Sequence, residues 1–454
     1  MIAPARMAAY DVLSAVSAGL ANLPDALATS RATLRDTRDQ ALAADIAIGV
    51  QRWRAALDHL IVSFSKRPIQ RLDREVVEVL RLSVYQLLHL TRVPAAAVVD
   101  DAVDLTGRAG KRSAAGLVNA VLRAVARNRR ALPLPPRPID PDDGQRALEY
   151  LSVTLSHPEW LASRWLRRYG FAATERWLQF DNVPAPLTLR ANRLRNTPDQ
   201  LIERLGRNQV SVRRARFAPD ALIVEDGQPL GGAGLEAGWF VVQDEASQLV
   251  SLLAGPDPGP RVLDCCASPG GKTTTLAVDM RDRGHGGLLV ACDVRKRRMD
   301  LLRRAVTASG VDNVRLVQAD LLRPLPFSRQ FDCVLVDAPC SGLGTLRRDP
   351  DIKWRRREED LGVFAAAQLD MLGNAAAAVA PGGRLIYATC SSEPEENESV
   401  AEAFLARRPE FSTWALAAAN TSVPPEVIDE RGHLRTYPHV HGLEAFFGAV
   451  FARL

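Results

Sequence analysis

Apolar residues recur at helical spacing throughout the first third of the chain. Three- and four-residue steps place one set of these residues on a single helical face: Leu42, Ile46, Val50, Trp53, Leu57 and Leu60. The same pattern returns between Val76 and Leu88 and again between Leu117 and Val125. Several amphipathic helices of this length predict a compact helical bundle over residues 1–132.

A proline-rich stretch interrupts this pattern. ALPLPPRPIDPDDG, residues 131–144, combines five prolines with acidic residues and glycine, which is typical of a semi-rigid linker, here placed at residues 133–144. Beyond it, LTLRAN, VSVRRARF and ALIVED read as strands, and Thr197-Pro198 opens a helix with a capping residue and an N-terminal proline. We therefore expect a small α/β module over residues 145–240, which binds RNA or connects its neighbours. Its many arginines suit either a phosphate-binding face or a solvated sheet face.

Short apolar runs alternate with helical stretches from residue 241 to residue 454. The runs are RVLDCC, GLLVACD, VRLVQAD, FDCVLVDAPC and GRLIYATC. This βαβ alternation predicts an α/β domain with a doubly wound, Rossmann-like and mostly parallel sheet.

The charge of the chain is unevenly distributed. Residues 1–135 hold 19 Lys and Arg against 12 Asp and Glu, a net charge of +7, whereas the whole chain has only +5. A basic front domain indicates a polyanionic partner such as RNA, although arginines that merely solvate helices would give the same count. No stretch of about 18 apolar residues suggests a membrane span, and the N-terminus reads as an amphipathic helix rather than a signal peptide.

The six cysteines show no spacing typical of a metal site, so we expect no metal and a reducing, cytoplasmic environment. Their positions within or at the ends of apolar runs are those of buried hydrophobes, with one or two reactive thiols among them.

A glycine-rich loop follows the first predicted strand of the sheet. It comprises Cys266, Ala267, Ser268, Pro269, Gly270, Gly271 and Lys272. The sequence GKT suggests a P-loop, but Cys266 stands where that motif requires its leading glycine, and Pro269 stiffens the loop. A glycine-rich turn at the carboxyl edge of such a sheet instead lets the backbone approach another nucleotide-like ligand.

Carboxylates end the first three strands of this sheet. They are Asp264, Asp293 and Asp320. Asp293, at the end of the second strand, is placed to bind ribose hydroxyls, and Asp320 can accept a hydrogen bond from an adenine amine. The series suits a neutral or cationic adenosyl ligand better than a polyphosphate.

Cysteines follow the next two strands. Cys340 lies in Asp337-Ala338-Pro339-Cys340-Ser341-Gly342, and Cys390 in Ala388-Thr389-Cys390-Ser391. Because ligands bind outside the carboxyl ends of such strands, both thiols should border one cleft. A thiolate at such an edge can add covalently to a bound substrate, which is nucleophilic catalysis. Ser392 and Glu395 resemble a capping box, and a helix starting there would favour the thiolate of Cys390, whereas the charges of Glu393, Glu395, Glu396 and Glu398 would oppose it.

At this point the chain resembles the bacterial Fmu/Sun-type 16S rRNA cytosine-C5 methyltransferases over essentially its whole length. The motifs that carry the resemblance are the loop just described, DAPCSG, RRDPDIKWRR, GRLIYATCS, PEENE and SHPEWL. The helical front domain is similar to the NusB-like RNA-binding domain of that branch.

The resemblance implies a nucleophile, a second cysteine and a cofactor. Cys390 would add to C6 of the target cytosine, which makes C5 nucleophilic enough to accept a methyl group, and Cys340 would help to release the product. S-adenosyl-L-methionine would be held by the loop from Cys266 to Lys272 and by Asp293, Asp320 and Asp337, the last of which would also face the target base. The basic residues around Trp354 form a candidate RNA-facing strip: Arg347, Arg348, Lys353, Arg355, Arg356 and Arg357. We expect a monomer that methylates C5 of one cytosine in 16S rRNA.

Three alternatives differ from this prediction. The substrate could be another RNA, such as tRNA or 23S rRNA. As in DNA cytosine-C5 methyltransferases, the Pro-Cys cysteine Cys340 could be the nucleophile, although the chain has no large DNA-recognition segment. A non-catalytic antitermination-like RNA-binding factor would leave the glycine-rich loop and both cysteines without a role.

Overall fold

A computed structural model describes residues 2–282, 287–416 and 422–454 of the chain. The chain forms two compact units. The helical unit comprises Met1–Pro184 and Leu346–Glu358, and the sheet unit comprises Ala185–Thr345 and Glu359–Leu454. The chain therefore leaves the sheet unit once, shortly after Cys340, and returns to it.

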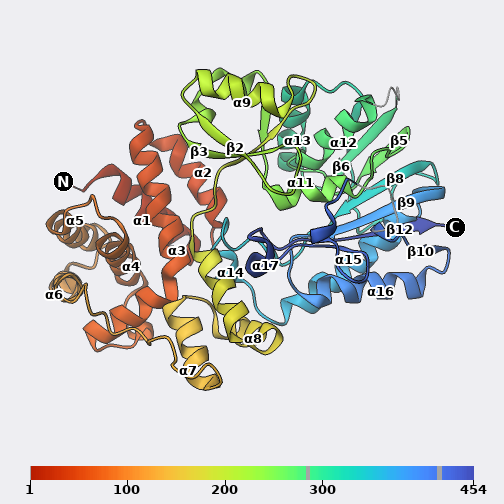
Figure 1. The fold of residues 1–454 in the computed structure, drawn as a ribbon. Helices are drawn as coiled ribbons and strands as arrows, with labels where there is room; N and C mark the ends of the chain where they lie inside the picture. Colours follow the sequence, from red (N-terminus) through yellow and green to blue (C-terminus); the bar gives the residue numbers. More distant parts are fainter. Residues whose placement is uncertain (1, 283–286, 417–421) are drawn as a thin grey trace. The chain divides into compact units, whose positions relative to one another are not determined.

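The helical unit begins with six helices, which confirms the predicted helical front region (Figure 1). They are α1 (Pro4–Ser17), α2 (Leu23–Thr33), α3 (Thr37–Ser65), α4 (Arg74–His89), α5 (Ala95–Arg108) and α6 (Ala115–Arg127). The apolar residues at helical spacing form their common core, in which Ile46, Leu60, Leu80 and Leu122 are fully buried.

The proline-rich segment packs on this bundle. Leu132 and Leu134 lie against the helical core, and the carbonyl oxygen of Pro135 accepts a hydrogen bond of 2.6 Å from Thr154 Oγ1. After it come α7 (Gly144–Glu149), the π-helical turn η3 (Tyr150–Thr154) and α8 (Glu159–Asn182). Trp165 and Trp177 of α8 are buried, with ring centroids 4.4 Å apart. The helical unit thus extends to Pro184, whereas the sequence pattern placed its boundary at residues 133–144.

Residues 346–358 add the short helix α14 (Ile352–Arg355) to the helical unit. Lys353 is 1% exposed, and its ammonium donates to the carbonyl oxygens of Arg52 at 2.9 Å and Ser156 at 2.6 Å. Trp354 donates its indole N–H to the carbonyl of Gln51 at 2.6 Å. Burial lowers the pKa of Lys353 to about 7. The prediction that Lys353 faces RNA is therefore wrong, because its amine is buried and donates to carbonyl oxygens inside the unit.

The sheet unit contains a small antiparallel sheet with strand order β2-β3-β1-β4. Its strands are β1 (Thr188–Ala191), β2 (Ser211–Arg214), β3 (Ala221–Asp226) and β4 (Phe240–Val242), and α9 (Pro198–Arg207) packs on it. Thr197 and Gln200 form a complete capping box at the start of α9, which confirms the predicted helix start. The short helix α10 (Ala233–Glu236) precedes β4.

The larger sheet has the order β10-β12-β9-β8-β5-β6-β7, with β11 paired to β12. Five strands are parallel: β5 (Arg261–Asp264), β6 (Leu288–Asp293), β7 (Val314–Gln318), β8 (Phe331–Asp337) and β9 (Val379–Thr389). The antiparallel strands are β10 (Phe411–Thr413), β11 (Leu434–Arg435) and β12 (Phe447–Arg453), and α17 (Pro438–His441) precedes β12.

Helices cover both faces of the larger sheet. Residues of α11 (Glu245–Leu252), α12 (Gly271–Asp282) and α13 (Lys296–Ser309) share one core cluster with Val262. Those of α15 (Asp360–Ala376) and α16 (Glu398–Arg407) share another with Leu263. Because neighbouring strand residues point to opposite faces, the two clusters lie on the two sides of the sheet. The predicted doubly wound fold is confirmed.

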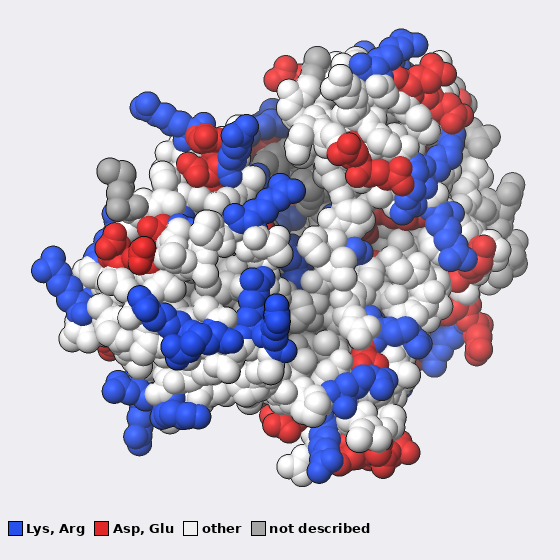
Figure 2. Space-filling view, turned by 60° about the vertical axis from the view of Figure 1, so that its left-hand side comes forward, with Lys and Arg blue, Asp and Glu red and all other residues white. Residues whose placement is uncertain are grey.

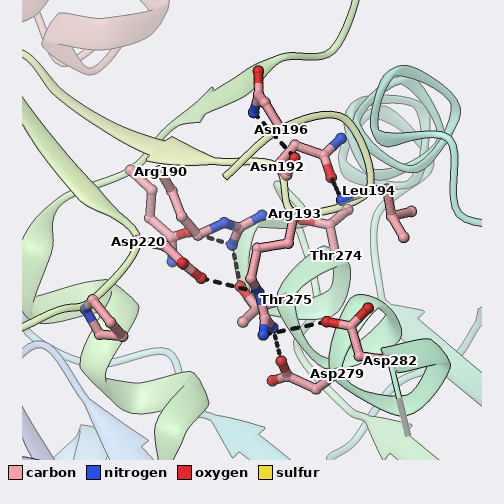
Figure 3. Close-up of polar contacts among 12 residues, drawn as sticks. Arg190, Asn192, Arg193, Leu194, Asn196, Asp220, Thr274, Thr275, Asp279 and Asp282 are labelled. Carbon is pink, nitrogen blue, oxygen red and sulfur yellow. Dashed lines mark hydrogen bonds and ion pairs between the residues drawn. The ribbon is translucent and has the colours of Figure 1, made fainter. Parts of the chain in front are cut away.

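Arginines of the small sheet contact α12 (Figure 3). Arg190 is 5% exposed and donates to Gln243 Oε1 at 2.6 Å and Thr274 Oγ1 at 2.7 Å, and it also bonds the carbonyl of Gly271. Arg193 pairs with Asp220, Asp279 and Asp282. Neither arginine belongs to an exposed phosphate-binding face; instead, Arg190 holds the small sheet to the start of α12, and Arg193 holds it to the end of the same helix.

Candidate active site

The glycine-rich loop joins β5 to α12. Gly270 has φ +108°, and a Cβ added there would lie 2.9 Å from the Ala305 side chain of α13. A Cβ on Gly271 would meet the Gln243 side chain at 3.1–3.3 Å. Glycine at these two positions thus lets the loop lie close to α13 and to the segment before α11.

A cavity of about 270 Å³ lies beside this loop. Predicted site residues that line it are Cys266, Ala267, Ser268, Pro269, Gly271, Lys272 and Asp337. Val241, Val242, Gln243, Ser247, Asp264 and Ala305 complete the wall. Sequence reasoning did not place Gln243 or Ser247 in the site, because Gln243 follows β4, a strand that was not predicted, and Ser247 lies near no predicted motif.

Asp264 presents an unused acceptor to this region. The carboxylate is 1% exposed; Oδ2 accepts a hydrogen bond of 2.7 Å from Thr273 Oγ1, and the buried Oδ1 has no partner among the described residues. Burial raises its pKa to about 7. A buried oxygen without a donor costs free energy, so a ligand that donates a hydrogen bond here is stabilised.

Asp293 and Asp320 do not line the cavity. Asp293 is buried and accepts hydrogen bonds from the backbone of Ser268 at 3.2 Å and of Val294 at 2.9 Å, and from Arg298 Nε at 3.1 Å. It therefore anchors the middle of the glycine-rich loop. Asp320 caps the turn after β7 through a bond of 3.0 Å from the Leu322 N–H.

Lys272 and Asp337 form an ion pair in the cavity wall, with Nζ and Oδ2 2.6 Å apart. Lys272 also donates to Ser247 Oγ at 3.2 Å. Burial opposes its charge, but the charge and hydrogen bond of Asp337 outweigh burial and raise the pKa of Lys272, so the ammonium stays protonated at neutral pH. The pair links the start of α12 to the end of β8.

The two predicted cysteines lie together. β8 and β9 are adjacent and parallel, with Asp337 opposite Ala388, and the Sγ atoms of Cys340 and Cys390 are 3.3 Å apart. Both residues are half-buried. The contact with Cys390, then burial and the charge of Glu396, raises the pKa of Cys340 well above its usual value, so Cys340 remains a thiol at neutral pH.

A buried carboxylate connects the residues that follow the two cysteines. Glu396 is 0% exposed and accepts hydrogen bonds from the Ser341 N–H at 2.7 Å, Ser391 Oγ at 2.6 Å and Gln368 Nε2 at 3.1 Å, and from the Ser341 hydroxyl as well. Gly344 adds a backbone bond of 3.0 Å to the Cys390 carbonyl. Glu396 thereby fixes the separation of the two thiols.

The predicted capping box at Ser392 and Glu395 is wrong. Residues Pro394–Glu396 form a short 3-10 helix, η5, and α16 begins at Glu398 without a side-chain cap. Ser392 Oγ donates instead to Glu393 at 2.7 Å. Glu396 is buried and accepts hydrogen bonds from Ser341 and Ser391, and α16 begins only after it, at Glu398. No long helix therefore begins directly after Cys390.

The other three cysteines lie outside the cavity. Cys265, Cys292 and Cys333 are buried, and burial raises the pKa of each thiol. Within residues 2–282, 287–416 and 422–454, no group of three or more His, Cys, Asp or Glu is placed to hold a metal ion. No helix in these ranges is long and apolar enough to cross a membrane.

Three family descriptions match the chain in series. They are the NusB family over residues 3–127, the ferredoxin-like domain of RsmF/B-like methyltransferases over residues 157–230, and 16S rRNA methyltransferase RsmB/F over residues 251–452. The second match spans both α8 and part of the small sheet.

Named relatives cover most of the chain. The Ribosomal RNA small subunit methyltransferase B of Pseudomonas syringae is 34% identical over 88% of this chain and 86% of its own. The Probable ribosomal RNA small subunit methyltransferase B of Bacillus subtilis is 31% identical over 90% of both chains. A Putative methyltransferase of Mycobacterium tuberculosis is 35% identical over 99% of this chain and 97% of its own.

Solved structures show the same fold. The crystal structure of PH0851 superposes with a TM-score of 0.80 at 26% identity over 99% of both chains. NSun6 from Pyrococcus horikoshii, solved with SFG, an analogue of S-adenosylmethionine, has a TM-score of 0.56 at 20% identity over 65% of this chain and 98% of its own.

Glu396→Ala tests whether this carboxylate holds the two thiols. The change leaves one buried N–H and two hydroxyls without their acceptor, so we expect urea unfolding to show a loss of about 3 kcal/mol of stability. The control is Glu395→Ala, a partly exposed glutamate in the same turn. Equal, small effects of both changes would contradict the assigned role.

Proposed function

Because the chain belongs to the RsmB/F family of 16S rRNA methyltransferases, we propose that it methylates C5 of one cytosine in 16S rRNA through a covalent bond between Cys390 and C6 of the base. The S-adenosylmethionine dependence is that of the family. The observation that carries the proposal is the 3.3 Å approach of two thiols at neighbouring strand ends, one of them held protonated.

The cavity beside the glycine-rich loop suits the cofactor. Its loop backbone, the free Oδ1 of Asp264 and the Lys272–Asp337 pair provide acceptors and donors for an adenosyl ligand. Asp293 would act by holding the loop as well as by reaching the ribose, and Asp320 would reach the adenine amine. S-adenosylmethionine supplies an electrophilic methyl group when it is bound.

The two cysteines have different roles in this reaction. The Cys390 thiolate forms a bond to C6, and the electron pair of the C5–C6 double bond becomes available at C5. Once C5 is methylated, a base removes the C5 proton, the double bond re-forms and the bond from Cys390 to C6 breaks. The Cys340 thiol, at 3.3 Å, can donate its S–H to the sulfur of Cys390 and so assist its departure from C6.

Electrostatic attraction to the phosphates would be the first contribution to RNA binding. The first 135 residues carry a net charge of +7, and Figure 2 shows many Lys and Arg side chains on the face that it presents. Phosphate contacts of this kind give affinity without sequence specificity, so they do not by themselves select the target cytosine.

The roles of the cysteines are separated by one denaturing gel. Each variant is incubated with 16S rRNA and S-adenosylmethionine. Cys340→Ala should attack and methylate but release slowly, so a slow protein–RNA band should appear. Cys390→Ala should give no band and no methylation. Cys292→Ala, which changes a buried thiol of β6 outside the cavity, is the control.

The reverse pattern in that gel would assign the nucleophile to Cys340. Retained methylation by both variants without any band would contradict the covalent mechanism.

Asp293→Ala tests the cofactor site. The change removes the acceptor that holds the Ser268 N–H, so calorimetry should show S-adenosylmethionine binding weakened by about 1–3 kcal/mol. Asp312→Ala, at an exposed position before β7, should leave the affinity unchanged. Normal affinity of a folded Asp293→Ala protein would remove this residue from the site.

A further inference from the structure

A second cavity, of about 220 Å³, lies within the helical unit. Leu60 of α3 and the packed leucines of the proline-rich segment, Leu132 and Leu134, form apolar walls. Trp53 and His89 contribute aromatic rings, and Arg129 contributes a guanidinium group. Pockets for drug-sized ligands run to roughly 300–1,000 Å³, so this one has room for a single small ring system.

The two aromatic rings of the wall, Trp53 and His89, stack on each other, and Tyr85, outside the wall, stacks on His89. The Trp53 and His89 ring centroids are 5.0 Å apart at an interplanar angle of 19°. The Tyr85 and His89 ring centroids are also 5.0 Å apart, at an interplanar angle of 22°. Desolvation of the His89 ring, followed by the charges of Arg129 and Arg52, lowers its pKa to about 4. His89 is therefore neutral at physiological pH and leaves the flat wall without charge.

Three arginines stand at the end of α6, and one of them lines the cavity. Arg127, Arg129 and Arg130 are all exposed, and Arg129 reaches the cavity wall. An uncharged planar platform next to several arginines is the arrangement by which proteins bind single-stranded nucleic acid: bases stack on the ring while cations contact the phosphates. A purely apolar ligand would make no use of these arginines.

We propose that this cavity binds one unpaired nucleobase of the substrate RNA, stacked beside Trp53, with the flanking phosphates on Arg127, Arg129 and Arg130. The proposal rests on RNA being the substrate, as the proposed function states. On this proposal the helical unit distinguishes RNA with an unpaired base from fully paired RNA, because an unpaired base must be present to fill the cavity. A uniform basic surface would not make this distinction.

The test compares Trp53→Leu, Trp53→Phe and wild type in the full-length protein, with unmethylated 16S rRNA as the probe. Loss of stacking should weaken RNA binding and raise the KM for RNA about 5- to 100-fold, while the phenylalanine variant keeps most of the affinity. The kcat at saturating RNA and the affinity for S-adenosylmethionine should stay unchanged. Trp414→Leu, in the sheet unit, is the matched control.

Salt dependence and fluorescence provide independent readouts. Arg129→Ala should lower the slope of log affinity against log salt, whereas Trp53→Leu should not. RNA should quench the tryptophan fluorescence of wild type more than that of Trp53→Phe, a measurement that does not depend on the leucine variant folding.

Unchanged RNA affinity of Trp53→Leu, or equal quenching in wild type and Trp53→Phe, would overturn the base pocket. Those results with normal methylation by wild type would leave the proposed function intact. Failure of wild type to bind or methylate the RNA would instead contradict the proposed function.

Discussion

The arrangement of the two thiols depends on one buried carboxylate. A charge in the interior of a protein is stable only where hydrogen bonds replace water, and Glu396 receives them from Ser341, Ser391 and Gln368. Ser341 and Ser391 each directly follow one of the cysteines. The same bonds that stabilise Glu396 therefore hold the two strand ends together, and the 3.3 Å contact between Cys340 and Cys390 follows from this arrangement.

The sequence predicted the parts of this site that depend on strand topology. Carboxyl ends of parallel strands meet at one edge, so Cys340 and Cys390 could be placed together once their strands were recognised. The glycine-rich loop was predictable for the same reason. The partners of buried polar groups were not: Glu396 stands in a run of glutamates whose spacing resembles a helix start, and nothing in that pattern shows that Glu393 and Glu396 are buried whereas Glu395 is partly exposed.

Basic residues show the same limit. A run of Arg and Lys around Trp354 indicates an exposed strip, yet Lys353 is buried. Its amine donates to the carbonyl oxygens of Arg52 and Ser156. The neighbouring Trp354 donates to the carbonyl oxygen of Gln51, so the segment is held against the helical unit. Arg190 likewise serves the packing of the small sheet on α12. The proline-rich stretch has the composition of a linker, but its leucines pack on the bundle and close a cavity. Composition predicts which residues are charged or stiff, whereas tertiary partners decide where they lie.

The covalent role of Cys390 is the central claim, and RNA that carries 5-fluorocytosine at the target position tests it most directly. Fluorine at C5 replaces the proton that a base must remove, so the enzyme should methylate the base and then stay attached. With wild-type protein and S-adenosylmethionine, mass spectrometry of the digested complex should find the methylated base on the peptide that contains Cys390. The same base on the Cys340 peptide, or no adduct while ordinary RNA is methylated normally, would contradict the account.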